Sequence, residues 1–150
     1  MKIYLDDVRT PTDSSWTVVR DYWEFCKLVF ATGLENIEAI SLDHDLGDEA
    51  MSEYYNNAKP NYTIDYSNIH EMTGMDCTKY IVHRSMETGV PLPQVYIHSA
   101  NPIGAANMLG YINNYLKNCR LPQTCVIRQI PHTYIDVMTD EQRLAKYIKK

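Results

Sequence analysis

The stretch KIYLDD, residues 2–7, is a short apolar run of strand character that ends on two adjacent acids. A second stretch, AISLDHD at residues 39–45, repeats the arrangement, again with acids directly after the apolar residues. Continuous runs of this kind are typical of strands buried in a parallel sheet. Because the carboxyl ends of parallel strands meet at one edge, the two stretches predict an acidic edge where a ligand would bind.

Outward from these two runs, strands and helices alternate along the chain. Residues 22–32 and the segment after residue 101 carry apolar side chains at helical spacing, and glycines and prolines end the helices. Such alternation predicts a three-layer α/β domain around a mostly parallel sheet. No helix is expected between the first two strands. The further predicted strands are residues 16–20, 95–97 and 125–128; the predicted helices are residues 22–32, 73–88, 101–116 and a short one from residue 139.

Composition limits the classes of protein that fit. A chain of 150 residues with 45% hydrophobic residues is expected to form a single domain spanning residues 1–150. A net charge of -5 argues against duplex nucleic acid as a partner. No apolar run approaches the ~18 residues of a membrane span, so we expect no membrane partner and a cytoplasmic location. The four cysteines lack a CxxC pair and are expected to be reduced core thiols. A homodimer is left open.

One segment breaks the alternation. Residues 48–70 are rich in tyrosine and asparagine and show no clear period, so a long loop is predicted there. Aromatic faces stack on bases and amides hydrogen-bond to their edges, which favours a nucleotide-binding surface. A lid or an oligomer contact fits the same composition.

Four carboxylates are predicted at the acidic edge: Asp6, Asp7, Asp43 and Asp45. Gathered in one place they would repel one another, and a hard divalent cation, Mg²⁺ or Mn²⁺, would relieve the repulsion. All four are therefore candidate metal ligands. The alternative is that they are solvated turn residues or helix caps.

Two histidines follow the predicted strands and are candidates for proton transfer, His44 and His98. Imidazole is the side chain that titrates near neutral pH without help from its surroundings. With Asp43 they form the predicted catalytic group. Each histidine could instead bind a metal or pack beside the sheet.

Candidate phosphate contacts lie in the loops at the same edge. Ser99 and Asn101 precede a helix whose N-terminus favours anions, although Asn101 could serve as the N-cap. Arg9 could bind phosphate or pair with a neighbouring aspartate. Thr73 is a phosphate contact or a second N-cap, and His132 follows the fifth strand.

Four blocks of sequence stand out at the predicted strand and helix ends: LDDVRTP at residues 5–11, SLDHDLG at 41–47, TGMD at 73–76 and HSANPIGAANM at 98–108. Taken together, these blocks resemble the cyclic-phosphate processing receiver-like domain family. This family is a divergent branch of the phosphoacceptor receiver fold and occurs in bacteria and their phages. The resemblance implies a receiver-like (flavodoxin-like) domain with a five-stranded sheet and a first helix that is reduced or absent.

The resemblance also assigns roles to individual residues. Asp6 and Asp7 match the acidic pair that holds the cation in receivers. Asp43 or Asp45 matches the aspartate that accepts a phosphoryl group, and Ser99 matches the hydroxyl residue after the fourth strand. Receivers carry a lysine before the proline of the fifth strand, whereas this chain has Ile130 there. This departure counts against ordinary phosphorelay signalling.

Three functions follow as hypotheses. The first is metal-assisted hydrolysis of a cyclic nucleotide, a cyclic dinucleotide or a 2′,3′-cyclic phosphate. The second is sequestration of such a ligand without cleavage, and the third is a phosphoacceptor receiver. In a phage-encoded chain, either of the first two would counter host immune signalling through cyclic nucleotides.

Overall fold

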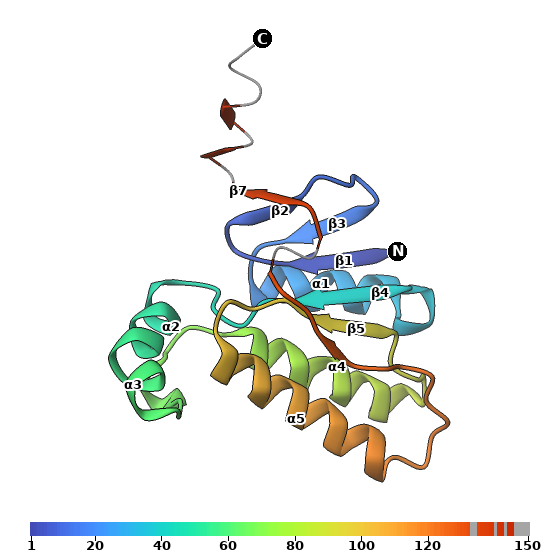
Figure 1. The fold of residues 1–150 in the computed structure, drawn as a ribbon. Coiled ribbons are helices and arrows are strands. Elements are labelled where there is room, and N and C mark those ends of the chain that lie inside the picture. The colour runs from blue at the N-terminus through green and yellow to red at the C-terminus, as the bar shows by residue number, and fades with distance from the viewer. Residues whose placement is uncertain (133–134, 140, 143, 146–150) are drawn as a thin grey trace.

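The computed structural model describes residues 1–132, 135–139, 141–142 and 144–145. Its main sheet contains five parallel strands in the order β3-β1-β4-β5-β6 (Figure 1). Numbered among themselves, the five strands run 2-1-3-4-5, which is the flavodoxin-like order. The strands are β1 (Lys2–Leu5), β3 (Trp16–Val19), β4 (Ala39–Leu42), β5 (Gln94–Ile97) and β6 (Arg128–Gln129).

As expected, no helix lies between β1 and β3; the chain forms a short strand there, which the sequence did not predict. This strand, β2 (Arg9–Pro11), pairs antiparallel with β7 (Val137–Thr139) in a separate two-stranded sheet. The pairing brings the start of the chain next to its end and holds the loop after β1 in place.

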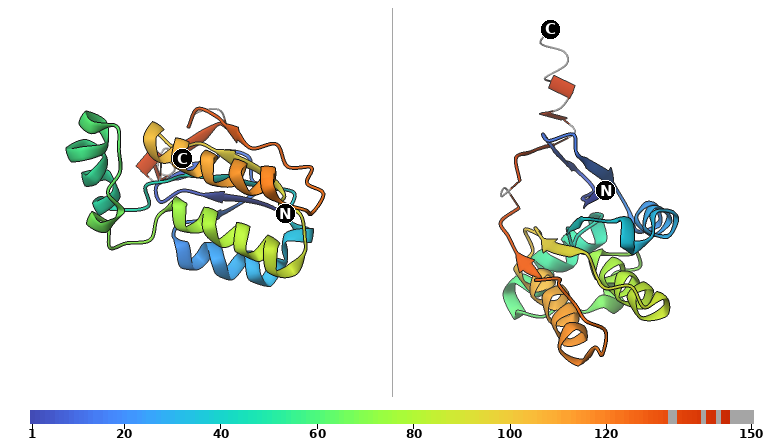
Figure 2. Two further views of the ribbon diagram at one scale, coloured as in Figure 1. Left: turned by 90° about the horizontal axis from the view of Figure 1, so that it is seen from below. Right: turned by 90° about the vertical axis from the view of Figure 1, so that its right-hand side faces the viewer.

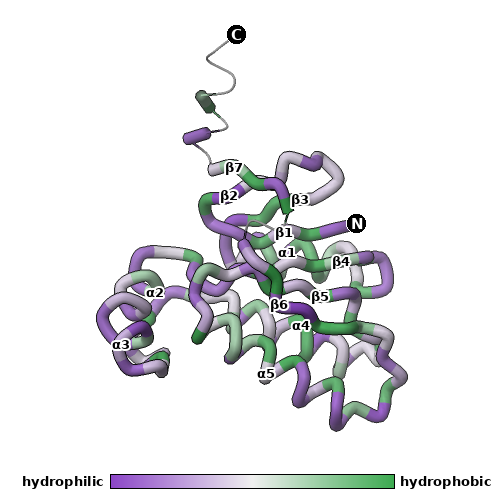
Figure 3. Tube along the Cα trace, viewed as in Figure 1, coloured by the Kyte–Doolittle hydropathy of each residue, from purple (hydrophilic) through white to green (hydrophobic). Residues whose placement is uncertain are grey.

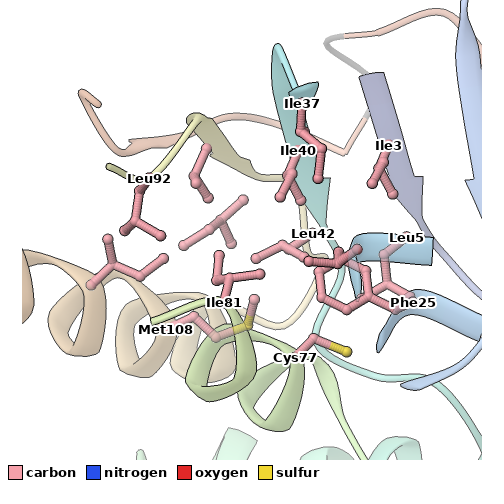
Figure 4. Packing of buried hydrophobic residues seen from close by; sticks show 14 of the residues in the cluster. Ile3, Leu5, Phe25, Ile37, Ile40, Leu42, Cys77, Ile81, Leu92 and Met108 are labelled. Carbon is pink, nitrogen blue, oxygen red and sulfur yellow. The ribbon is translucent and has the colours of Figure 1, made fainter. Parts of the chain in front are cut away.

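Three long helices supply most of the remaining core: α1 (Tyr22–Thr32), α4 (Gly74–Thr88) and α5 (Pro102–Asn118). Figure 2 shows α4 packed between α1 and α5. Alternate residues of β1 and β4 join side chains of the helices in one hydrophobic cluster (Figure 4). The five-stranded parallel sheet with its helices is consistent with the predicted three-layer α/β receiver fold.

Helix ends follow the predicted signals. Asp21 caps α1 by accepting from Glu24 N, and Gly33 follows that helix with a φ of 83°. Thr73 caps α4, and Gly89 ends it in the left-handed conformation, where glycine is favoured. The caps place the N-terminus of α4 directly beside the carboxyl end of β4.

The prediction of a long loop at residues 48–70 is wrong, because most of this insertion is helical (Figure 1). Its irregular pattern has a structural cause. The insertion carries no continuous apolar stripe along the chain (Figure 3), and hydrogen bonds between polar side chains hold it together. The carboxylate of buried Glu53 accepts hydrogen bonds from the side chains of Asn57 and Asn68. The insertion consists of α2 (Asp48–Glu53), the π-helical η2 (Tyr54–Ala58), α3 (Lys59–Asn61) and the 3-10 turn η3 (Tyr66–Asn68).

One further prediction is wrong. The fifth strand is β6, residues 128–129, and not residues 125–128, because the side chain of Gln94 in β5 bonds to Val126 N and O, where the main chain of β5 would pair with a longer strand. The tail helix predicted from residue 139 is confirmed in its described part, since residues 141–142 and 144–145 are helical, although Thr139 itself ends β7. Residues 140, 143 and 146–150 of that prediction lie outside the described residues.

All four cysteines are free; Cys77 is buried, and the other three are half-buried. Among the described residues, no helix is long and apolar enough to cross a membrane.

Candidate functional site

The carboxyl ends of three neighbouring strands bring Asp6, Asp43 and His98 together. Asp6 follows β1, Asp43 follows β4 and His98 follows β5, so each is the first residue beyond its strand. All three are buried, and one possible ligand atom of each lies within 4.8 Å of the others. The predicted acidic edge therefore exists, and it includes a histidine nitrogen.

Asp6 is the most fully bonded of these groups. Its Oδ1 accepts from the main-chain N–H groups of Val8 (3.0 Å) and Arg9 (2.8 Å). Its Oδ2 accepts from Arg9 Nη1 (3.2 Å) and lies 3.1 Å from His98 Nε2. Burial opposes ionisation of Asp6, but the hydrogen bonds from His98, Val8 and Arg9 outweigh it and lower the pKa of Asp6. These contacts favour the ionised form of Asp6.

His98 has both ring nitrogens occupied. Nδ1 lies 2.7 Å from the Ser41 hydroxyl and Nε2 faces Asp6, while the ring stacks on Tyr4 with centroids 4.4 Å apart. Burial lowers the pKa of His98 despite the neighbouring carboxylate. A neutral ring that accepts from Ser41 and donates to Asp6 satisfies both contacts. His98 therefore fixes the position of Asp6.

The two carboxylate oxygens of Asp43 differ in their contacts. Its Oδ1 accepts from His44 N at 2.8 Å, whereas Oδ2 lies 4.0 Å from Arg9 Nη1. Burial, followed by the charge of Asp6, raises the pKa of Asp43 well above its usual range. The Arg9 guanidinium lies near both carboxylates, and the remaining repulsion that Asp43 meets from Asp6 when it is ionised is one that a bound cation would offset.

A cleft of about 200 Å³ opens beside this cluster. Half-buried Asp7 is part of its lining, and burial together with the charge of Asp6 raises the pKa of Asp7 to about 6. The cleft draws side chains from three parts of the chain: Asp7, Arg9, Asp43 and Asp45 after the strands, Ser99 and Asn101 before α5, and Met51, Tyr54 and Tyr55 from the insertion.

Ser99 and Asn101 shape the loop between β5 and α5. Asn101 Oδ1 accepts from Gly104 N at 2.9 Å, so Asn101 is the N-cap of α5. Asn101 Nδ2 donates to Asp45 Oδ1 at 3.2 Å and so holds that carboxylate at the cleft. The Ser99 hydroxyl accepts from Asn101 N, which leaves its own hydrogen for a ligand.

His44 is fully buried and does not line the cleft. Its Nδ1 lies 2.6 Å from Asp45 Oδ1, and its Nε2 lies 2.9 Å from the Tyr66 hydroxyl in the insertion. A Cβ at Gly104 would lie only 2.4 Å from His44 Cγ, so only glycine allows α5 to pack so closely. His44 links the cleft to the insertion and has no free nitrogen for a ligand.

The contact between His44 and Tyr66 should contribute to the stability of the fold. Tyr66→Phe removes the hydroxyl that contacts His44 Nε2 and Asn107 Nδ2, so it should lower the free energy of unfolding by about 1–2 kcal/mol. The matched control is Tyr62→Phe, at a tyrosine of the same insertion that is 82% exposed. Urea denaturation of both variants measures the difference. Equal stabilities would contradict a structural role for the His44–Tyr66 contact.

Two predicted phosphate contacts lie away from the cleft. Buried Thr73 accepts from Met75 N and forms a capping box with Asp76, so it is the N-cap that the sequence left as an alternative. Half-buried His132 lines a neighbouring cavity of about 530 Å³, which shares Ser99 with the cleft. A direct phosphate contact by either residue stays a prediction.

Several residues of the site were not predicted from the sequence. Ser41 holds His98, and its polar side chain within a buried strand was the available signal. Arg20 Nη1 donates to Asp6 O at 3.0 Å, and its Nη2 donates to Thr10 Oγ1 at 2.6 Å. Met51 lines the cleft from the insertion. Contacts of this kind depend on tertiary packing and leave no local pattern.

A parallel sheet in the 2-1-3-4-5 order, with acids after its first and third strands, defines a receiver-like α/β domain. A family model described as the cyclic-phosphate processing receiver domain matches residues 1–114, and the chain belongs to that family. The match covers the acidic edge, the insertion and most of α5. No curated protein and no solved structure matches the chain.

Proposed function

We propose that this domain binds a cyclic phosphate-containing nucleotide in the cleft and hydrolyses its phosphodiester with the help of Mg²⁺ or Mn²⁺. The observation that carries the proposal is the convergence of buried Asp6, Asp43 and His98 beside a cleft lined by further carboxylates and Arg9. The family's description supports the class of ligand.

The charge of the cleft supports the need for a cation. Asp7, Asp43 and Asp45 line it against the single guanidinium of Arg9, so a phosphate would be repelled without further positive charge. Asp6 and Asp43 offer carboxylate oxygens that suit Mg²⁺ or Mn²⁺, and His98 holds the Asp6 carboxylate in place. A cation held there neutralises phosphoryl oxygens and lowers the pKa of a bound water.

The chain's own groups would orient the ligand. The Arg9 guanidinium is anchored on Asp6 and lines the cleft, where its remaining N–H groups can donate to a phosphate oxygen. The Ser99 hydroxyl supplies a second donor. Both donors are fixed before the ligand arrives, which is what orientation of a phosphodiester requires.

Hydrolysis needs a proton acceptor at the cleft. Water forms the new bond to phosphorus, one ester P–O bond breaks, and the product is a phosphate monoester. Asp7 or Asp45 accepts a proton from the water, and the departing ribose oxygen takes up a proton from solvent. His44 and His98 act through Asp45 and Asp6, respectively, as positioning residues, in contrast to the direct proton transfer expected from the sequence.

Product analysis tests this proposal. The protein is incubated with cyclic mono- and dinucleotides and 2′,3′-cyclic phosphates, with Mg²⁺, Mn²⁺ or EDTA, and the denatured mixture is separated by chromatography. We expect a ring-opened monoester only where a divalent cation is present. Intact nucleotide that raises the melting temperature would show sequestration, which the aromatic side of the cleft also fits. Unchanged nucleotide with an unchanged melting temperature would contradict both functions.

A further inference from the structure

One wall of the cleft has no role in the chemistry described above. The insertion contributes Met51, Tyr54 and Tyr55 to it. Tyr55 is 59% exposed and Met51 is 47% exposed, whereas Ala50 and Ala58 of the same insertion are buried. The insertion therefore packs inward through small residues and leaves its large apolar side chains at the cleft.

Helical geometry accounts for this arrangement. Met51, Tyr54 and Tyr55 are spaced three and four residues apart, which places them on one helix face. The π-helical η2 begins at Tyr54, and π-helical turns occur frequently at functional sites. Contacts that do not involve the tyrosines fix the helix, among them the hydrogen bond from Ala50 N to Glu71 Oε1 at 2.8 Å.

The two rings are held in defined orientations. Their centroids lie 5.2 Å apart with an interplanar angle of 68°, so the edge of one ring meets the face of the other. The Lys59 ammonium lies 5.6 Å from the centroid of the Tyr55 ring. A ring positioned in advance loses little conformational entropy when a flat ligand stacks on it.

We propose that Tyr54 and Tyr55 form a stacking wall for one nucleobase, so that the cleft takes a nucleoside cyclic monophosphate. The inference rests on the proposed function and narrows its substrate class. The charged side of the cleft holds the phosphate and its cation, and the aromatic side holds the base. Every base offers a π-face, so the wall favours nucleotides over cyclic phosphates that lack a base.

The number of stacking places favours one nucleotide over two. The cleft itself has a volume of about 200 Å³, below the roughly 300–1,000 Å³ typical of pockets for drug-sized molecules, and a cavity of about 530 Å³ shares Ser99 with it. Volume therefore does not choose between a mononucleotide and a cyclic dinucleotide. The pair of tyrosines beside one charged side of the cleft matches one base and one phosphate, and this arrangement favours the nucleoside cyclic monophosphate.

Calorimetry with slowly hydrolysed analogues tests the wall apart from catalysis. The ligands are a nucleoside cyclic monophosphorothioate and the matching analogue with a methoxy group in place of the base, both with Mg²⁺. The variants are Tyr55→Ala, Tyr55→Phe and the double variant Tyr54→Ala/Tyr55→Ala. Tyr62→Ala is the matched control, because Tyr62 belongs to the same insertion and is not part of the cleft lining.

We expect the nucleoside analogue to bind the wild type about tenfold or more tightly than the base-free analogue. Tyr55→Ala and the double variant should remove that advantage without changing affinity for the base-free analogue. Tyr55→Phe, which keeps the ring, and Tyr62→Ala should retain it.

Equal binding of both analogues by the wild type would overturn the stacking wall and leave the proposed function standing. A double variant that melts like the wild type and still prefers the nucleoside analogue would do the same. Failure of the wild type to bind either analogue would overturn the wall together with the proposed function.

Discussion

Asp43→Asn should reduce Mg²⁺-dependent hydrolysis at least about 100-fold, because the amide removes the charge that would hold the cation and so weakens the site. The same substitution should leave the metal-free protein folded, since an amide oxygen can still accept from His44 N. Burial and the charge of Asp6 raise the pKa of Asp43, so the fold favours the protonated carboxyl group. An uncharged Asn mimics that form, and the metal-free variant should gain about 1 kcal/mol at neutral pH.

Two readouts separate these effects. Initial rates with a cyclic nucleotide report on hydrolysis, and melting curves with and without Mn²⁺ report on cation binding independently of turnover. Asp48→Asn is the matched control, because Asp48 is an exposed carboxylate at the start of α2. Full activity of Asp43→Asn, or the same Mn²⁺-dependent rise in melting temperature as the wild type, would contradict the assigned role of Asp43.

Gly74→Ala should cost about 3 kcal/mol or more of unfolding free energy. A Cβ at Gly74 would lie 1.8 Å from the main-chain oxygen of Asp43, and backbone cannot move aside as a flexible side chain can. Gly74 N also donates to His44 O at 2.8 Å, so the start of α4 is tied to the acidic loop. A shift that relieves the clash would displace Asp43 and lower activity as well.

Gly110→Ala provides the matched comparison within a helix. Gly110 lies in α5, and a Cβ there would meet nothing within 4 Å. Alanine is the better helix former, so this variant should gain about 0.5–1 kcal/mol. Urea denaturation gives both free energies. If Gly74→Ala unfolded within about 0.5 kcal/mol of the wild type, the close contact between α4 and the Asp43 loop would be wrong.

Much of the fold could be predicted because its signals are local. Apolar runs such as residues 2–5 and 39–42 became the central strands, and Gly33 and Thr73 marked helix ends correctly. The fifth strand was misplaced because the Gln94 side chain replaces strand pairing at Val126, a contact across 32 residues. Such an exchange has no counterpart in local hydropathy.

The candidate site was predicted in part. Strand ends brought Asp6, Asp43 and His98 together, because topology alone places them at one edge. The hydrogen-bond partners of His44 and His98 could not all be predicted. Their partners Ser41 and Tyr66 lie far along the chain, and these contacts leave each ring without a free nitrogen.

The insertion shows most clearly which structure cannot be predicted from hydrophobic periodicity. Its helices are stabilised by polar contacts such as those of Glu53 with Asn57 and Asn68, which produce no apolar period to detect. The tyrosine-rich composition nevertheless indicated a binding surface, and Tyr54 and Tyr55 do line the cleft. Composition therefore indicated chemistry where periodicity failed to predict structure.

The most direct measurement for the central claim is ³¹P nuclear magnetic resonance of a nucleoside cyclic monophosphate incubated with the protein and Mg²⁺. Our account predicts that the cyclic phosphate resonance is replaced by a monoester resonance, and that EDTA prevents the change. In ¹⁸O-labelled water, one labelled oxygen should enter each product phosphate. A cyclic phosphate resonance that persists unchanged in Mg²⁺, across the panel of nucleotides, would contradict hydrolysis at this cleft.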